Sequence, residues 1–321
     1  MSDIIFPSID DYLKEFTGFD VDATQISSGN FLCRQRRFYL PKFILGDRFI
    51  STALQYQATL LKDCFYIVIP KNNVGMYMNG KKTNFNLPLL FTENQEMLIR
   101  TPSNSINFHI LISTDELSEY LDEGMIEQLK KISSLQNTGK TIFIQSESNQ
   151  KYLCTLIENL LNKNELLNYQ EVLDAQESIL KSLCKILNLA PEFRKIKHIN
   201  KPTRLAIVNR ALSYIHKDSS LKMTVPEVAE VSFCCARSLE YAFKSILKMT
   251  PKQYLIKRRL QLIHSILKNQ SDIPISEIVE KFGIVNQGRF AQDYLKFYNE
   301  YPHETRGRMS RLKNIEFVDL C

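Results

Sequence analysis

The chain has 321 residues, a formal net charge of +6 and 44% hydrophobic residues. This length is sufficient for two domains that each bury a core, and the sequence contains no apolar run of about 18 residues that would make a membrane-spanning helix. The first residues lack the basic and apolar regions of a signal peptide, so we expect a soluble, cytoplasmic protein without a membrane partner.

The positive charge is concentrated in one third of the chain. Residues 201–310 contain 18 lysines and arginines against 10 acidic residues, whereas residues 1–200 contain 21 against 23. This asymmetry predicts a module that binds a polyanion, attached to a nearly neutral one. A basic solvated surface without a partner is the alternative that the count leaves open.

Seven cysteines are scattered along the chain. None forms a C-x-x-C pair or lies at ligand spacing from a histidine, so we expect free thiols, no metal site and no cofactor. A redox role for the adjacent Cys234 and Cys235 is the alternative.

Residues 26–112 contain short runs rich in β-branched and aromatic residues, separated by turn residues. Such runs, recurring about every ten residues, predict an antiparallel barrel or sandwich. Asn79-Gly80 is a pair that favours a two-residue hairpin turn. The runs are RFYLPKFIL, FISTALQY, CFYIVIP, GMYMNGK and INFHILIS.

The pattern changes to a helical period after Ser113-Thr114-Asp115-Glu116, which has the composition of a helix N-terminus. Leucine and isoleucine recur at helical spacing from Leu117 to Ile132 and again from about 148 to 188. These stripes either pack on the β domain or, in part, form a surface for self-association. We keep both interpretations and expect a homodimer.

The segment "PEFRKIKHINKP" has a proline at each end and no hydrophobic period, which predicts a linker over residues 191–203. We therefore expect a regulatory or dimerisation domain at residues 1–190, a helical domain at residues 204–310 and a tail at residues 311–321.

A helix-turn-helix pattern lies in "MTVPEVAEVSFCCARSLEYAFKSILKMTP". Thr224 is a good N-cap residue, so we expect a short helix from Val225 to about Val231, with Val228, Ala229 and Val231 inward, and a second helix from about Ala236. The second helix would bury Leu239, Ala242, Phe243 and Ile246 and expose Arg237, Glu240, Tyr241 and Lys244.

The pattern occurs a second time in "IPISEIVEKFGIVNQGRFAQDYLKFYNEYP", with a turn at Gly283 and a helix from Gln287. Between the two copies, "PKQYLIKRRLQLIHSILK" predicts one amphipathic helix of about 16 residues and about 25 Å. Such a helix is able to hold two recognition helices about one DNA turn apart.

Residues 204–308 resemble the AraC/XylS family of transcription regulators. The resemblance implies an α+β chain whose C-terminal all-α domain holds two helix-turn-helix motifs joined by a long helix. It also implies a regulator that is more often an activator than a repressor. The matching positions are Ala229, Arg237, Leu239, Phe243, Lys244, Thr250, Pro251, Tyr254, Leu255, Arg259 and Leu260, then Ile278, Gly283, Phe290, Tyr294, Pro302 and Arg306.

By position, the resemblance also implies which side chains meet DNA. Arginine suits guanine edges and glutamine suits adenine edges, whereas glycine clears space for the backbone. The residues expected at base edges are Arg237, Glu240, Tyr241, Gln287, Gly288, Ala291 and Gln292. Those expected at phosphates are Lys244, Lys252, Arg289 and Lys296.

The chain departs from the family pattern at several structural positions. Cys235 stands where serine usually caps the first recognition helix, which should cost about 1 kcal/mol and loosen the first motif. Lys248 replaces a helix-ending glycine, and Asn299 replaces another glycine, as asparagine is able to do. Val279 stands in place of a small alanine, and Ile284 in place of a common phenylalanine.

The first half is similar to the cupin-like β-barrel domain that many of these regulators carry, on "SSGNF" and "NGK". His109 is the only histidine in the first 190 residues, which argues against a metal centre of clustered histidines. If one face of "CFYIVIP" lined the barrel, it would hold a small apolar effector, and nearby arginines would bind a carboxylate group of that effector. The alternative is that the strand residues only pack a core and the arginines are solvated. The candidate pocket is Arg34, Arg36, Arg37, Phe65, Ile67 and Ile69.

These observations predict a sequence-specific transcription regulator, not an enzyme. Its expected partners are double-stranded promoter DNA, RNA polymerase and a small-molecule effector or a second copy of the chain. Two alternatives remain: a non-specific nucleic-acid-binding protein, and an N-terminal enzyme fused to a DNA-binding module. The second would need a catalytic constellation, yet neither Cys33 nor Cys64 has a recognisable base beside it.

Overall fold

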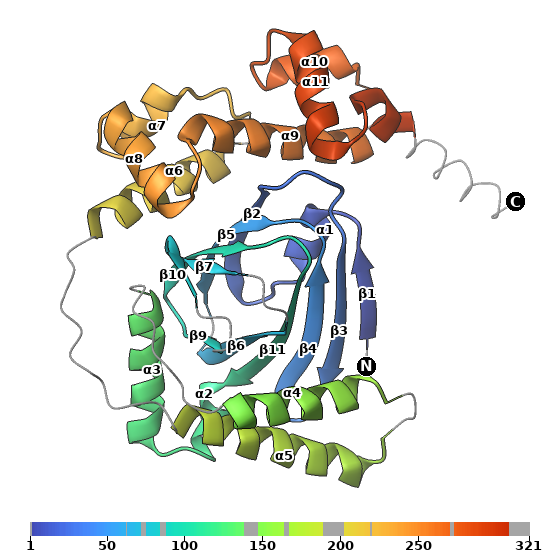
Figure 1. Ribbon diagram of the computed structural model, residues 1–321, viewed down its shortest axis with the longest axis vertical. Helices are drawn as coiled ribbons and strands as arrows, with labels where there is room; N and C mark the ends of the chain where they lie inside the picture. The colour runs from blue at the N-terminus through green and yellow to red at the C-terminus, as the bar shows by residue number, and fades with distance from the viewer. Residues whose placement is uncertain are drawn as a thin grey trace, which may run out of the picture. The chain divides into compact units, whose positions relative to one another are not determined.

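A computed structural model describes residues 2–61, 63–71, 75–83, 88–137, 147–163, 167–188, 202–218, 220–269 and 273–307 (Figure 1). The chain divides into two compact units. Unit 1 comprises Met1–Val21 and Leu32–Asn200, and unit 2 comprises Asp22–Phe31 and Lys201–Cys321. The predicted tail and most of the predicted linker lie outside the described residues. Within those residues, none of the helices combines the length and the hydrophobicity that a membrane span requires.

Unit 1 is built around two sheets of antiparallel strand pairs, which confirms the predicted antiparallel β domain. One sheet has the order β1-β3-β4-β11-β6-β9, and the other has the order β2-β5-β10-β7-β8 (Figure 1). The elements are β1 (Ser2–Phe6), α1 (Ile9–Lys14), β2 (Phe19–Gln25, of which Phe19–Val21 belong to unit 1), β3 (Cys33–Tyr39), β4 (Phe43–Ile50), β5 (Leu54–Leu60), β6 (Cys64–Pro70), β7 (Tyr77–Met78), β8 (Lys81–Lys82), β9 (Leu89–Phe91), β10 (Glu96–Thr101) and β11 (Ser105–Ser113).

The turns explain where the strands end. Asn79 and Gly80 have φ values of 49° and 81° and join β7 to β8, which confirms the predicted hairpin. The predicted run "RFYLPKFIL" is two strands, because Leu40 N donates a hydrogen bond to Phe43 O at 3.0 Å and closes a turn between β3 and β4. In β4, a Cβ atom on Gly46 would lie 2.1 Å from Arg36 O, so only glycine fits beside β3.

Four helices follow the strands: α2 (Thr114–Ser118), α3 (Glu123–Asn137), α4 (Glu147–Leu161) and α5 (Tyr169–Asn188). Ser113 Oγ accepts a hydrogen bond from Glu116 N at 3.1 Å, which confirms the predicted N-cap. The apolar stripes of α3, α4 and α5 join β4, β6 and β11 in one buried cluster. The described members of these stripes therefore pack on the β domain, as the first of the two interpretations holds.

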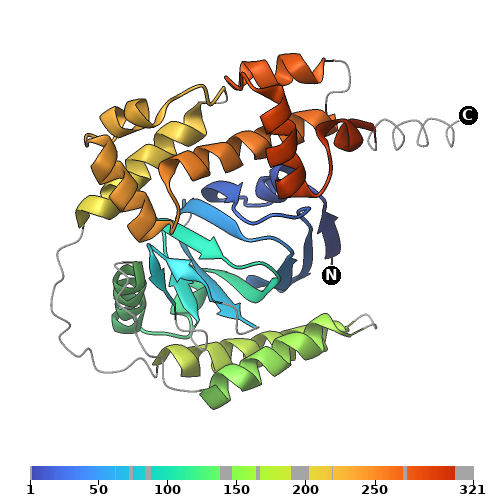
Figure 2. The ribbon, with the colours of Figure 1, turned by 45° about the horizontal axis from the view of Figure 1, so that its top comes forward.

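The helices of unit 2 match the predicted order. They are α6 (Pro202–Lys217), α7 (Val225–Val231), α8 (Ala236–Ile246), α9 (Pro251–Asn269), α10 (Ile275–Lys281) and α11 (Gln287–Tyr298). Figures 1 and 2 show α7 and α8 beside one end of α9, and α10 and α11 beside its other end. At 1.5 Å per residue, the 19 residues of α9 span about 28 Å.

Unit 2 also contains a segment from far upstream, which the predicted boundaries assign to the first domain. The amide group of the Gln261 side chain, on α9, accepts a hydrogen bond from Gln25 N at 2.8 Å and donates one to Ala23 O at 3.1 Å. Arg258 Nη1 donates a further hydrogen bond to Ala23 O at 2.9 Å. Asp22–Phe31 therefore satisfies buried polar groups of α9 and belongs to the structure of the helical unit.

Candidate nucleic-acid interface and effector cavity

The first motif begins at the predicted cap. Glu227 Oε2 accepts a hydrogen bond from Thr224 N at 2.6 Å. A side chain of the first turn thus supplies the acceptor that this amide lacks within the helix. Helix α7 ends at Val231, and Phe233 follows with φ 54°, a left-handed conformation that favours glycine. Val231, which the sequence analysis places inward, is 41% exposed because it lies at the end of its helix.

Helix α8 carries the first exposed polar face. Its N-cap residue, Cys235, makes no side-chain cap hydrogen bond, as its residue type predicts. Lys244 Nζ lies 2.7 Å from Glu240 Oε1, and Arg237 Nη2 lies 3.3 Å from Tyr241 Oη. Exposed pairs four residues apart contribute little to stability, so these side chains remain available to another partner.

The second motif uses other residue types at its caps and turn. Gly283 follows α10 with φ 67°, and Asn286 Oδ1 accepts a hydrogen bond from Arg289 N at 2.9 Å at the start of α11. Asn299 ends α11 with φ 58°, which confirms that asparagine takes the left-handed position. The exposed residues of α11 are Gln287, Gly288, Arg289, Gln292 and Lys296.

The remaining expected DNA-facing residues differ in exposure. Lys252 is exposed in the first turn of α9, whereas Ala291 on α11 is half-buried. At Gly288, an added Cβ atom would have only one neighbour within 4 Å, Asn286 Oδ1 at 3.6 Å, which is an ordinary contact. The helical unit itself therefore does not require glycine at position 288.

The two recognition helices are equivalent when they are aligned at their N-caps, Cys235 and Asn286. Buried residues of α8 then correspond to buried residues of α11: Leu239 is equivalent to Phe290, and Phe243 to Tyr294. The exposed positions carry different side chains. Arg237, Glu240 and Tyr241 of α8 correspond to Gly288, Ala291 and Gln292 of α11.

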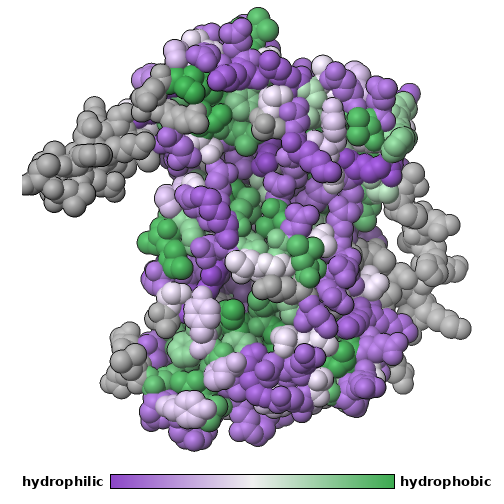
Figure 3. Space-filling model, turned by 180° about the vertical axis from the view of Figure 1, so that it is seen from behind, coloured by the Kyte–Doolittle hydropathy of each residue, from purple (hydrophilic) through white to green (hydrophobic). Residues whose placement is uncertain are grey.

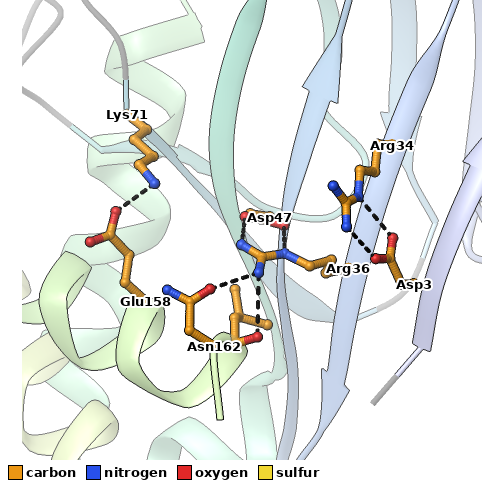
Figure 4. Close-up of polar contacts among 8 residues, drawn as sticks. Asp3, Arg34, Arg36, Asp47, Lys71, Glu158 and Asn162 are labelled. Atoms are coloured by element: carbon orange, nitrogen blue, oxygen red, sulfur yellow. Dashed lines mark hydrogen bonds and ion pairs between the residues drawn. The ribbon is translucent and has the colours of Figure 1, made fainter. Parts of the chain in front are cut away.

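In unit 1, the three arginines expected to bind an effector are already paired with acidic side chains. Figure 4 shows two of these pairs on the strands β3, β1 and β4. An arginine that is saturated by a neighbouring carboxylate is a poor first choice for an anionic ligand. The pairs are Arg34 with Asp3 (2.5 Å), Arg36 with Asp47 and with Asn162 Oδ1 (2.8 Å), and Arg37 with Glu15 (2.7 Å).

The other half of the expected pocket requires a correction. Phe65, Ile67 and Ile69 are fully buried on the face of β6 that packs in the same cluster as the helices α3, α4 and α5. The opposite face of β6, with Tyr66 and Val68, lines a cavity. The alternation in "CFYIVIP" is real, but the face turned to the cavity is the other one.

The cavity lies in the β domain of unit 1 and consists of two pockets, of about 60 and 80 Å³, which share part of their lining. Its walls are mostly apolar in the smaller part, where Val21, Ala58, Met76, Phe91 and Met97 contribute. Five residues line both parts, and three of them carry polar groups. The five residues are Phe16, Phe19, Arg48, Tyr66 and His109.

The polar residues of the lining form a chain of contacts. The Arg48 guanidinium lies over the rings of Phe16 and Tyr12, at 4.8 and 5.1 Å from their centroids, and Arg48 Nη1 lies 3.5 Å from Tyr66 Oη. Tyr66 Oη lies 2.6 Å from His109 Nδ1. Burial and the charge of Arg48 hold the pKa of His109 well below its usual value, so the imidazole is neutral at pH 7.

The sequence analysis missed Arg48, Tyr66 and His109 as site residues. The available signal was the position of polar side chains on strands that are otherwise apolar, in "CFYIVIP" and "INFHILIS". A lone histidine inside a β-branched run is a buried polar group that needs a partner.

Comparisons with known proteins agree with the geometry of unit 2. Residues 228–308 match the family described as "Helix-turn-helix domain". The XylDLEGF operon transcriptional activator of Pseudomonas putida is 30% identical over 98 residues, which cover 30% of each chain. The probable thc operon regulatory protein of Rhodococcus erythropolis is 22% identical over 277 residues, which cover 81% of this chain and 80% of that one.

Among solved structures, the AraC-like transcriptional activator CuxR is 12% identical and aligns over 83% of this chain and 96% of its own, with a TM-score of 0.45. The match to the Pseudomonas putida activator covers only 98 of the 321 residues. The chain thus spans about 30% of the length of the first curated relatives that it matches.

Proposed function

We propose that this chain, which through residues 228–308 belongs to the AraC/XylS family of helix-turn-helix proteins, is a transcription regulator that binds double-stranded promoter DNA at specific sequences. The observation that carries the proposal is the pair of helix-turn-helix motifs on the 19-residue helix α9, each with an exposed polar recognition helix. A connecting helix of about 28 Å is able to hold the two recognition helices about one DNA turn apart, in two successive major-groove segments.

The two recognition helices read bases in different ways. On α8, the side chains of Arg237, Glu240 and Tyr241 are all exposed and therefore available to DNA. Arg237 donates to guanine, and Glu240 and Tyr241 contact the edges of neighbouring bases. On α11, Gln287 and Gln292 suit adenine, while Ala291 offers only a methyl group. The second segment is therefore specified by fewer side-chain hydrogen bonds than the first.

Gly288 supports a close approach of α11 to DNA. Glycine inside a helix costs about 0.5–1 kcal/mol relative to alanine, and the helical unit has room for a Cβ atom at this position. A Gly288→Ala variant should therefore be at least as stable as the wild type, but bind DNA more weakly. If the variant binds DNA as the wild type does, the backbone of α11 does not approach the bases at this position.

Phosphate contacts come from exposed cations around the recognition helices. Lys244, Lys252, Arg289 and Lys296 are all exposed, and they surround the base-facing positions in sequence. Such contacts fix the orientation of the protein on the duplex without reading sequence, and each one makes the affinity more dependent on salt.

Unit 1 controls the DNA-binding unit, as an effector-binding or dimerisation domain in the cytoplasm. The cavity of unit 1 supports effector binding, because it combines apolar walls with a buried cation. We propose further that the regulator activates transcription by recruiting RNA polymerase, since similar proteins are named as activators. No catalytic role is proposed for unit 1.

A selection of genomic fragments with purified full-length protein, repeated at two salt concentrations, tests the proposal. A regulator should enrich a few fragments that share two short conserved segments about one turn apart, and the enrichment should survive at higher salt. Uniform binding of all fragments with a steep loss in salt would instead indicate a non-specific nucleic-acid-binding protein.

A further inference from the structure

Arg48 is a buried cation without an acidic partner. Its side chain is 8% exposed, and within the described residues no ion pair joins it to a carboxylate; Asp47 and Glu15 pair with Arg36 and Arg37. Its Nε–H group has no hydrogen-bond acceptor there either. Burying an unpaired charge costs several kcal/mol, so the site is incomplete as a purely structural arrangement.

The direction of the neighbouring hydrogen bonds follows from their chemistry. Arginine only donates, so Tyr66 Oη accepts from Arg48. This leaves the Tyr66 hydroxyl proton able to donate to His109 Nδ1, and we assign the bond in that direction. The neutral His109 ring then carries its proton on Nε2, an atom that is buried and has no partner among the described residues. Two unused donors, Arg48 Nε–H and His109 Nε2–H, therefore belong to residues that line the same cavity.

The smaller part of the lining is mostly apolar, whereas the larger part also carries Glu15, Thr17, Gln35 and Arg37, of which Glu15 and Arg37 pair with each other. Met76, Phe91, Met97 and Ile99 line the smaller part, together with Ala58. A ligand that fits must offer acceptors at one end and an apolar surface elsewhere. Its volume of about 60–80 Å³ in each part indicates a small molecule rather than a peptide.

We propose that this cavity binds a small monocarboxylate with an apolar body, whose carboxylate oxygens accept hydrogen bonds from Arg48 and His109. The inference rests on the proposed role of unit 1 as an effector-binding domain and names the chemical class of the effector. A carboxylate supplies the counter-charge that Arg48 lacks and an acceptor for its unused donor. The apolar body fills the part of the cavity lined by methionine and phenylalanine.

Isothermal titration of the purified full-length protein tests this inference without DNA. The probes are straight-chain carboxylates of four to ten carbons, with the matching primary alcohols and primary ammonium compounds as controls. We expect one chain length to bind as the carboxylate at least about tenfold more tightly than as the alcohol, because a hydrogen-bonded buried charge pair exceeds a neutral hydrogen bond by that factor or more. The ammonium compounds should not bind.

Three variants separate the binding site from general effects on folding. Arg48→Gln should weaken carboxylate binding at least about tenfold and leave alcohol binding nearly unchanged. Ala58→Leu fills the apolar part without touching Arg48 and should weaken both. Arg34→Gln, which removes only the exposed pair with Asp3, should bind as the wild type does. Circular dichroism confirms that each variant is folded.

Each result decides one statement. If no carboxylate binds the folded wild type, or if carboxylate and alcohol bind alike, the inference is wrong, whatever the protein does to DNA. If the carboxylate binds and Arg48→Gln abolishes the preference, the inference holds. DNA binding is then measured separately with and without the bound probe, and an unchanged DNA affinity would count against the proposed control function alone.

Discussion

The two helix-turn-helix motifs have the same left-handed backbone positions and helix N-caps but fill them with different residues. The second motif places Gly283 and Asn299 at its left-handed positions and Asn286 at its N-cap. The first motif has Phe233 and Lys248 at the equivalent left-handed positions, and Cys235 at the cap. At three positions, therefore, the second motif uses residue types that the local backbone favours, and the first does not.

The opposite holds for the side chains that face outward. The first recognition helix presents Arg237, Glu240 and Tyr241, whereas the second presents Gly288 and Gln292 at the matching positions. The second motif thus has the more favourable backbone positions, and the first has the richer set of polar side chains. One exception is the N-cap of α7, Thr224, which is better than that of α10, Pro274. We expect the first motif to be the looser and the more selective of the two.

A fall in pH should increase the difference in local stability between the two motifs more than any single substitution does. His216 on α6 contacts Tyr254 at 2.8 Å, and burial together with the charge of Arg258 lowers the pKa of His216 to about 3, even though Asp22 lies 3.5 Å from its Nδ1 atom. The unfolded chain takes up this proton near pH 6.5, and the folded chain does so only near pH 3. Stability should therefore fall as the pH drops below 6.5, by up to about 1.4 kcal/mol per pH unit.

Urea unfolding between pH 7 and pH 4.5 measures this effect, and hydrogen exchange locates it. The His216→Gln variant should show a flatter dependence on pH over the same range. Amides of α8 should lose protection in acid before those of α11, since α6 packs on α7 and α8. An unchanged slope in the variant would show that other groups cause the acid sensitivity.

The two turns should respond unequally to substitution. Gly283→Ala should destabilise unit 2 by about 1–2 kcal/mol, because alanine is strained at φ 67° even though no atom lies closer than 3.7 Å to the added Cβ atom. Phe233→Gly relieves a similar strain in the first motif but makes the unfolded chain more flexible, so its stability should change by less than about 1 kcal/mol. Thermal unfolding of both variants measures the contrast. Equal losses in both would mean that the turns are not strained differently.

Exchanging the caps is the next smaller test. Cys235→Asn should stabilise α8 by about 1 kcal/mol, because an asparagine side chain accepts a hydrogen bond from the first turn, as Asn286 does. Asn286→Cys should destabilise α11 by a similar amount. Denaturant midpoints of the two variants and of the double exchange give the measurement. A loss in both single variants would show that Cys235 has a role that its cap geometry does not explain.

The helix ends should show the smallest effect. Lys248 has φ 57°, and its side chain donates a hydrogen bond to Ser245 O at 2.7 Å, which offsets part of the strain. Lys248→Asn should therefore stabilise the protein by only about 0.5 kcal/mol, and Asn299→Lys should destabilise it by about the same amount. Precise unfolding curves with the double variant as a reference are needed to resolve these changes.

The sequence predicts unit 2 well because its signals are local. Thr224 and Pro226 mark the start of α7, and Asn299 marks the end of α11, through local backbone preferences, so these helix ends lie where they are expected. The docking of Asp22–Phe31 on α9 has no such signal. It depends on Arg258 and Gln261 meeting carbonyl and amide groups more than 230 residues away, which no local pattern reveals.

The cavity shows the limit of periodicity. Alternation in β6 identifies two faces, Phe65 with Ile67 and Tyr66 with Val68, but neither face is exposed and Tyr66 is only half-buried, so hydrophobicity does not distinguish them. The helices α3, α4 and α5 cover the face with Phe65 and Ile67, which leaves the other face for the cavity. The pattern of a strand does not predict which of its faces a helix will cover. Arg34, Arg36 and Arg37 form the conspicuous basic cluster of the sequence, yet each has an acidic partner, whereas the isolated Arg48 lines the cavity.

The most direct test of the account is a binding cycle between protein and DNA. On the enriched site with its two segments, affinities are measured for the wild type, Arg237→Ala and Gln292→Ala, on the intact site and on sites with one segment altered. We predict that Arg237→Ala costs about 1–3 kcal/mol and removes discrimination at one segment only, while Gln292→Ala costs less and affects only the other. If both variants lose affinity equally on every site, the two helices do not read separate segments and the account is wrong.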